Sequence, residues 1–167
     1  MNRRVFSAVL AGLGAGLAGV AGIRLWESGG PVPSGPVPPS DLPVRRLGRT
    51  GLDVPILALG GHHVGLAGSE RNARRVVEAA LEEGIRFFDT AESYQAGDSE
   101  RWLGSALRDV RSQVLLMSKT HSPRDRSSGS ARDHLEGSLE RLGTDYLDLW
   151  QLHSTKSPED VDLAFRP

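Results

Sequence analysis

The sequence predicts an α/β fold built around a parallel sheet. Short apolar stretches alternate with amphipathic stretches of helical period, in repeats of about 30 residues that are typical of β/α units. Three successive apolar stretches also lead into ionisable residues. Parallel strands end at one edge of their sheet, where such folds keep their functional groups. Four such strands with helices on one side would form half of a (β/α)8 barrel. A small doubly wound sheet is the alternative, which the lack of a G-x-G-x-x-G turn after the first strand disfavours.

The composition narrows the classes of function. The formal net charge is −1, so the sequence gives no indication of a nucleic-acid partner. The chain has no cysteine, which excludes disulfides and thiolate chemistry. Its five histidines include no HxxxH pair, so we expect no metal site.

Residues 1–26 are expected to precede the folded domain. Arg3 and Arg4 come before a weakly apolar, Gly/Ala-rich run over 8–23, which is the layout of a signal peptide. The segment 2–6 also resembles a twin-arginine export signal. Alternatively, residues 5–25 would form a membrane anchor, since about 20 residues can just span a bilayer. The domain is therefore expected to be exported (periplasmic or extracytoplasmic) or anchored to the membrane of a bacterium.

Residues 27–43 form a predicted linker. Six prolines, with serines and glycines between them, favour an extended tether over a packed segment. The folded domain is therefore expected over 44–167.

The domain is expected to start with a hairpin over 44–54, whose turn is Gly48–Gly51. An apolar strand over 55–59 follows it. The strand leads into Gly60 and Gly61, whose lack of side chains would let a ligand approach the backbone closely. His62 and His63 come next, at the same edge.

Apolar stripes at helical spacing predict helices over 70–83, 99–108 and 131–142. The stripe of the first helix includes Val76. We expect that helix to begin at Ser69 as N-cap and to stop at Gly84. Later strands are predicted over 85–89, 114–117 and 146–152, and a last helix begins near Pro158.

The segment Phe87–Tyr94 takes the chain from a buried strand straight into polar residues. Its apolar part ends at Asp89, the next strand is followed by Lys119, and the last strand ends at His153. Neighbouring strands lie about 4.8 Å apart, so groups at adjacent strand ends can touch. We therefore expect a carboxylate, a phenol, an amine and an imidazole to meet at one edge.

These four groups suit the reduction of a carbonyl compound. Lys119 follows an apolar strand, so its ammonium needs an anion, and Asp89 is the nearest candidate. An ammonium beside Tyr94 stabilises the phenolate and makes the phenol a better proton donor to a carbonyl oxygen. His153 can hydrogen-bond the same oxygen and orient it. Because no side chain supplies a hydride, this chemistry needs a cofactor.

Four separated motifs resemble those of the aldo-keto reductase family. They are Leu47–Leu52 (LGRTGL), Phe87–Tyr94 (FFDTAESY), Met117–Lys119 (MSK) and Asp145–His153 (DYLDLWQLH), in the same order as in that family. The similarity runs from about Val44 to the end of the chain. It implies a (β/α)8 TIM barrel, of which this chain holds an N-terminal hairpin and about the first four β/α units.

The resemblance also implies a site and its ligands. NADPH, or NADH, is the expected cofactor, and a small carbonyl compound is the expected substrate. The family's catalytic tetrad falls on Asp89, Tyr94, Lys119 and His153. The nicotinamide is expected near Gly60, Gly61 and Asp89. His62 and His63 are expected to line the substrate pocket, where the family more often has small or aromatic residues.

The family's remaining four β/α units have no counterpart in this sequence. Those units carry most contacts to the phosphates and adenine of the cofactor, so we expect a fragment with little or no activity alone. An incomplete barrel has open strand edges and an uncovered apolar face, which predicts self-association. Two other functions remain open: a non-catalytic barrel that binds a partner as a regulatory subunit, and an aldolase that uses Lys119 as a Schiff-base nucleophile.

Overall fold

The computed structural model of the protein describes residues 42–121 and 130–164. The expected leader (1–26) lies outside this part, as does the expected linker up to residue 41. Over the described residues, no helix combines the length and the apolar character needed to cross a membrane.

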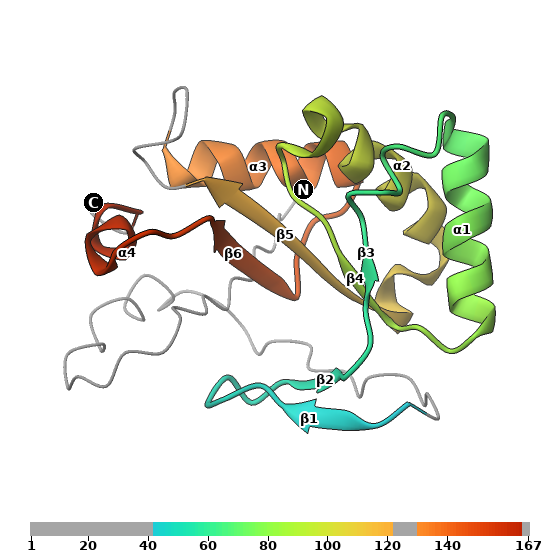
Figure 1. Ribbon diagram of the computed structural model, residues 1–167, viewed down its shortest axis with the longest axis horizontal. Coiled ribbons are helices and arrows are strands. Elements are labelled where there is room, and N and C mark those ends of the chain that lie inside the picture. Colours follow the sequence, from blue (N-terminus) through green and yellow to red (C-terminus); the bar gives the residue numbers. More distant parts are fainter. Residues whose placement is uncertain (1–41, 122–129, 165–167) are drawn as a thin grey trace.

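A parallel sheet of four strands forms the centre of the domain (Figure 1). The strands lie in the order in which they occur along the chain: β3 (Leu59–Gly60), β4 (Phe87–Asp89), β5 (Leu115–His121) and β6 (Leu149–His153). Each β/α unit therefore adds its strand beside the previous one. This is the arrangement expected for half of a (β/α)8 barrel.

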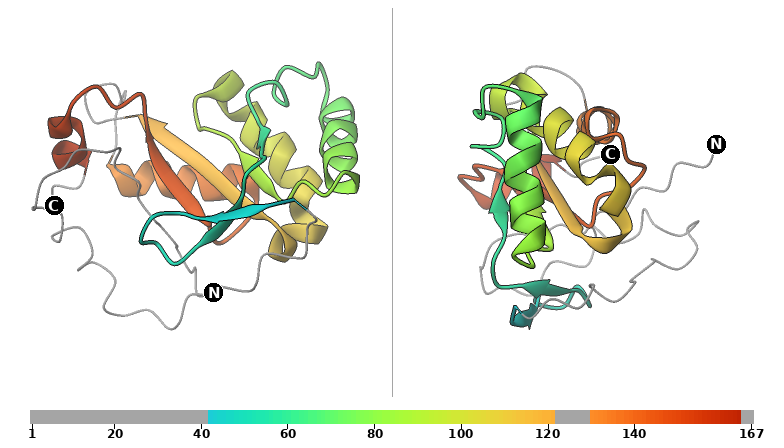
Figure 2. Two further views of the ribbon diagram at one scale, coloured as in Figure 1. Left: turned by 60° about the horizontal axis from the view of Figure 1, so that its bottom comes forward. Right: turned by 90° about the vertical axis from the view of Figure 1, so that its right-hand side faces the viewer.

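Three helices, α1 (Glu70–Glu82), α2 (Asp98–Leu107) and α3 (Ala131–Leu142), follow β3, β4 and β5 in turn. Figures 1 and 2 show them side by side along one face of the sheet, with the shorter α4 (Pro158–Ala164) beyond β6. The predicted helices are confirmed to within one or two residues at each end. Val76 was misplaced, however: it is 45% exposed, whereas Ala73 and Val77 are fully buried.

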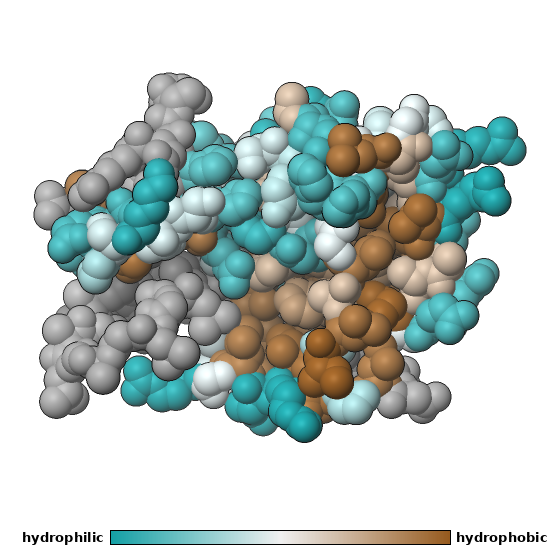
Figure 3. All heavy atoms as spheres, in the orientation of Figure 1, coloured by the Kyte–Doolittle hydropathy of each residue, from teal (hydrophilic) through white to brown (hydrophobic). Residues whose placement is uncertain are grey.

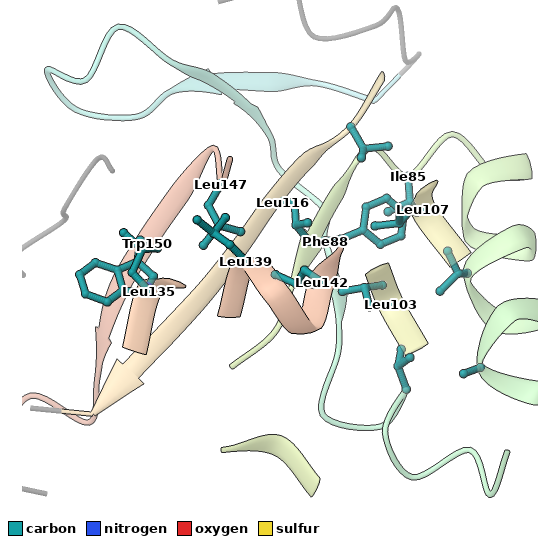
Figure 4. Close-up of a cluster of buried hydrophobic side chains, with 14 residues drawn as sticks. Ile85, Phe88, Leu103, Leu107, Leu116, Leu135, Leu139, Leu142, Leu147 and Trp150 are labelled. Atoms are coloured by element: carbon teal, nitrogen blue, oxygen red, sulfur yellow. The ribbon is translucent and has the colours of Figure 1, made fainter. Parts of the chain in front are cut away.

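The hydrophobic core lies between this helical layer and the sheet (Figure 4). Phe88, Leu116 and Trp150 contribute to it from three neighbouring strands, and Leu103 and Leu139 pack against them from α2 and α3. Each of these side chains is more than nine-tenths buried. Burying one such side chain contributes about 1.5–3 kcal/mol, so this layer holds the strand ends in place.

Helix ends are set by local hydrogen bonds. The Ser69 hydroxyl accepts from the backbone N–H of Asn72 at 3.2 Å, and Gly84 leaves α1 with φ of 82°. Both residues confirm the predicted boundaries. A reciprocal pair of hydrogen bonds between Ser130 and Asp133 starts α3, which satisfies donors that a helix start would otherwise leave unpaired.

The predicted hairpin is confirmed. β1 (Val44–Arg46) pairs antiparallel with β2 (Asp53–Pro55), and Gly48 and Gly51 both take positive φ in the turn between them. The hairpin lies at the end of the sheet where the parallel strands begin, away from the strand ends that carry the polar residues (Figure 1).

The predicted strand over 55–59 is wrong in its extent. Pro55 belongs to the hairpin, where it pairs with Val44, and β3 begins only at Leu59. Ile56 and Leu57 join the two strands and are 60% and 52% exposed. Figure 3 shows apolar side chains gathered on this face of the molecule. The apolar side chains of Ile56 and Leu57 therefore lie on the surface and do not belong to a buried strand.

Three other strands differ from prediction at their ends. β5 continues through Ser118 and Thr120 to His121, because both hydroxyls find buried acceptors, the carboxylates of Glu100 and Glu92. β6 starts at Leu149 and not at 146, and β4 starts at Phe87 and not at 85.

Candidate active site

Alternation along the strands brings three of the four predicted groups to one face of the sheet. Asp89 pairs with Met117 and Lys119 pairs with Gln151, in register with β6. Leu116 on β5 points into the helix-facing core, so Lys119 points to the opposite face. His153 follows two residues after Gln151 on that same face, where Asp89 also lies.

The ammonium of Lys119 joins the acid and the phenol. Its Nζ donates to Asp89 Oδ1 at 2.5 Å, to the Thr90 carbonyl at 2.9 Å and to the Tyr94 hydroxyl at 3.3 Å. The Lys119 side chain is only 12% exposed and that of Asp89 26%. An ammonium has three N–H donors, and each has an acceptor here, so Lys119 is held in one position.

Tyr94 sits between two imidazoles. Its ring lies 5.0 Å from that of His62 and 5.5 Å from that of His153, with the planes nearly perpendicular in both pairs. Tyr94 begins a short 3-10 turn, η2 (Tyr94–Gly97), in which Gln95 and Ala96 both have positive φ. Non-glycine residues in that region are uncommon and often mark functional turns.

His153 is a neutral base in this environment. Burial lowers its pKa from the ordinary 6.5, and the charges of Lys119 and His121 lower it further, against weaker opposite effects from Asp89 and Glu92. Its Nδ1 is buried and has no hydrogen-bond partner in the described part of the chain. A neutral imidazole carries one N–H and can donate one hydrogen bond to a bound oxygen.

The profile of the Aldo/keto reductase family matches residues 56–166. The chain belongs to this family.

An oxidoreductase of Bacillus subtilis, named uncharacterized oxidoreductase YrpG, is 39% identical over 125 residues, which cover 64% of this chain and 38% of that protein. Among solved structures, the chain is similar to an aldo-keto reductase of Bacillus halodurans in its holo form. The TM-score is 0.62 and the identity 32%, over 74% of this chain and 44% of that one.

A second solved structure is that of an aldo-keto reductase from Klebsiella pneumoniae in complex with NADPH. It matches with a TM-score of 0.53 and 32% identity, over 68% of this chain and 41% of that one. The chain thus spans about two fifths of the length of these relatives. These neighbours are TIM barrels, and the four parallel strands described above are half of that fold.

Gly60, the last residue of β3, and Gly61, which follows it, differ in their surroundings. A Cβ added to Gly61 would lie 2.5 Å from the backbone oxygen of Asp89, because the Gly61 N–H donates to that oxygen at 2.6 Å. Gly61 is therefore needed for close packing of two strands. A Cβ at Gly60 would meet nothing within 4 Å, so Gly60 borders open space next to its register partner, Asp89.

His62 and His63 are both exposed, and only His62 contacts the site directly. The Nδ1 of His62 lies 3.3 Å from Gln95 Nε2, and the ring of His63 packs edge-on against that of His62 at 5.3 Å. The expected pocket residues thus lie at the outer edge of the site, with His62 beside Tyr94 and His63 behind it.

Two supporting residues were not singled out from the sequence. Glu92 accepts from the Thr120 hydroxyl at 2.6 Å, and its other oxygen lies 2.6 Å from His134 Nδ1 on α3. Ser99 on α2 donates to the Gly61 carbonyl at 2.7 Å and lies 2.8 Å from the Thr90 hydroxyl. Ser99 could have been found, since helical spacing places it on the same stripe as the buried leucines of α2.

The site fits the nicotinamide end of the cofactor that the family implies. Gly60 leaves its side of the strand end open beside Asp89, and the Lys119 ammonium joins the carboxylate of Asp89 to the Tyr94 hydroxyl. In residues 42–121 and 130–164 there is no group of three His, Cys, Asp or Glu side chains that could hold a metal ion.

Proposed function

We propose that this chain is part of an NAD(P)H-dependent reductase that converts small aldehydes or ketones to alcohols. The observation that carries the proposal is the position of the Lys119 ammonium, within hydrogen-bond distance of both Asp89 and the Tyr94 hydroxyl. The complex of the Klebsiella pneumoniae relative with NADPH supports the choice of cofactor.

The reaction assigns one task to each group. When bound, the reduced nicotinamide supplies a hydride to the carbonyl carbon. Tyr94 gives its proton to the carbonyl oxygen, so that the C=O bond becomes a CH–OH group. Lys119 stabilises the phenolate that Tyr94 leaves behind, and Asp89 fixes Lys119 in place.

His153 completes the site by orienting the substrate. A neutral imidazole can donate one hydrogen bond to the carbonyl oxygen without competing with Tyr94 as an acid. His62, on the other side of the Tyr94 ring, is placed to contact the rest of the substrate. We propose Gly60, with Asp89, as the place where the nicotinamide lies against the backbone.

The aldolase alternative fits the geometry poorly. A Schiff-base lysine needs an unprotonated nitrogen with a free lone pair. Lys119 Nζ instead donates to three oxygens, one of them a carboxylate at 2.5 Å. Borohydride trapping with an aldehyde should therefore give no covalent adduct on Lys119.

The test compares the 167-residue chain with a hybrid barrel. In the hybrid, residues 42–164 are joined to the second half of the barrel of the Bacillus halodurans relative. With NADPH and a small aromatic aldehyde, absorbance at 340 nm should fall in the presence of the hybrid and barely change with the chain alone. A folded hybrid that binds NADPH without turnover would favour the non-catalytic binding function instead.

A further inference from the structure

His121, which has no role in the reaction described so far, lies directly against His153. The two residues are register partners at the ends of β5 and β6. Their rings are stacked, with centroids 4.9 Å apart and planes 20° from parallel. Adjacent strands are about 4.8 Å apart, so the ladder of the sheet itself sets this stacking distance.

His121 is itself held in place by its backbone. Its N–H donates to Glu92 Oε1 at 3.3 Å, and the same oxygen accepts from the Thr120 hydroxyl. Glu92 belongs to the loop between Asp89 and Tyr94. The backbone of His121 is therefore tied to the same loop that carries the phenol.

Among the described residues, no group makes the hydrogen bond to Nδ1 of His153 that usually orients a functional imidazole. Such a ring is ordinarily fixed by the bond that its second nitrogen makes. The Nδ1 of His153 is buried and has no hydrogen-bond partner among the described residues. The plane of the ring must then be set by what packs on it, which is His121 on its face and Tyr94 at an interplanar angle of 82°.

We propose that His121 is a positioning residue for His153: its ring stacks flat on the imidazole and holds it perpendicular to the Tyr94 ring. In the proposed reaction, on which this inference rests, the stack keeps the His153 ring in the orientation that substrate binding needs. His121 does not touch the reacting atoms, and it acts only through His153.

His121 also affects the pKa of His153 through its charge. The groups that face His153 are Lys119 and His121 from β5, Asp89 from β4, and Glu92 and Tyr94 from the loop after β4. Burial lowers the pKa of His153 most, and the positive charges of Lys119 and His121 add to it. Replacing His121 by phenylalanine would keep the flat ring and remove that charge, which separates the two effects.

The test is NMR of the whole 167-residue chain labelled with ¹⁵N-histidine. The five histidines and two tyrosines give few enough signals to assign. Nuclear Overhauser contacts between the His153 and Tyr94 rings should persist in His121→Phe and disappear in His121→Ala. The titration midpoint of His153 should move to higher pH in His121→Phe. His63→Ala removes an exposed imidazole whose ring, among the described residues, packs on that of His62, so it should change neither readout.

Circular dichroism identifies any variant that loses its fold. If His121→Ala is unfolded, His121→Leu, which fills the space without a flat ring, takes its place in the ring-contact measurement. Undiminished ring contacts in a folded variant without the flat ring, or lost ring contacts in a folded His121→Phe, would overturn the proposal. None of these readouts needs turnover, so a failure of the reductase function would be seen separately in the absorbance assay.

Discussion

The position of Tyr94 depends on residues that come from three different elements. Lys119 on β5 reaches the Tyr94 hydroxyl, while Glu92 ties the intervening loop to Thr120 on β5 and to His134 on α3. One contact holds the Tyr94 hydroxyl itself, and the others hold the loop that leads into Tyr94. Such contacts can position a functional side chain on a loop as precisely as one on a strand.

Glu92 and His153 should make the stability of the fold depend on pH. Burial alone would raise the pKa of Glu92, but hydrogen bonds from Thr120 and His134, with the charge of His134, hold it below the ordinary 4.5. Burial lowers the pKa of His153 below 6.5. In both cases the unfolded chain binds more protons than the folded one just below the ordinary pKa, so stability falls as the pH falls.

The expected result is a Tm that is constant above about pH 6.5 and declines below it, because His153 takes up a proton in the unfolded chain before it does so in the folded one. The Tm should decline again below 4.5, where the same holds for Glu92. Differential scanning calorimetry between pH 8 and pH 4 measures it. Glu92→Gln should remove the lower step and leave the upper one. A Tm that does not change over this range would contradict the assigned environments of both groups.

The site residues could be predicted because their chemistry is visible in the local sequence. Asp89, Lys119 and His153 each follow an apolar stretch, and their position at strand ends follows from the β/α alternation alone. His121 was missed because the strand was expected to stop at Met117. The alternation of Met117, Lys119 and His121 would have placed it on the site face, had the strand been extended.

At the scale of elements, strand boundaries were the least predictable feature. Ser118 and Thr120 interrupt the apolar pattern of β5, yet both are fully buried. Their hydroxyls bond to Glu100 on α2 and to Glu92, which are distant in sequence. Such long-range partners leave no trace in a local pattern, whereas helix ends were predicted well because their caps lie within a few residues.

The crossing of α2 and α3 gives a prediction about packing. A Cβ added at Gly104 on α2 would collide with the backbone carbonyl of Leu142 at the end of α3. Backbone atoms cannot move aside as a side chain can, so Gly104→Ala should lower the free energy of unfolding by about 1–3 kcal/mol. Urea unfolding followed by circular dichroism measures the change.

Gly137→Ala on α3 is the matched control. There the added Cβ would meet the Nη1 atom of Arg141 at 3.1 Å, a side-chain atom that can shift by a few tenths of an ångström while Nε and Nη2 keep their bonds to Glu100 and Ser138. Alanine is favoured over glycine inside a helix by about 1 kcal/mol. This variant should be as stable as the unmodified chain or more so, and equal losses in both variants would show that the two helices do not approach as described.

At the scale of the whole molecule, the described domain is an open half of a closed barrel. In the described residues, β3 and β6 each have one neighbouring strand, so their outer edges are unpaired. Ile56 and Leu57 lie exposed where the hairpin meets the sheet. Self-association of the 167-residue chain therefore stays a prediction, with open edges as its physical reason, and export through residues 1–26 stays one as well.

Proton donation by Tyr94 is the central claim, and Tyr94→Phe in the hybrid barrel tests it most directly. The chain has only two tyrosines. The other, Tyr146, lies in the loop before β6, where its ring packs against Arg111, so Tyr146→Phe is the matched control. We predict that Tyr94→Phe lowers kcat for NADPH-dependent aldehyde reduction by about 10²–10⁴-fold, with NADPH affinity unchanged, while Tyr146→Phe leaves kcat nearly as it was. Equal kcat values for Tyr94→Phe and the unmodified hybrid would contradict the account.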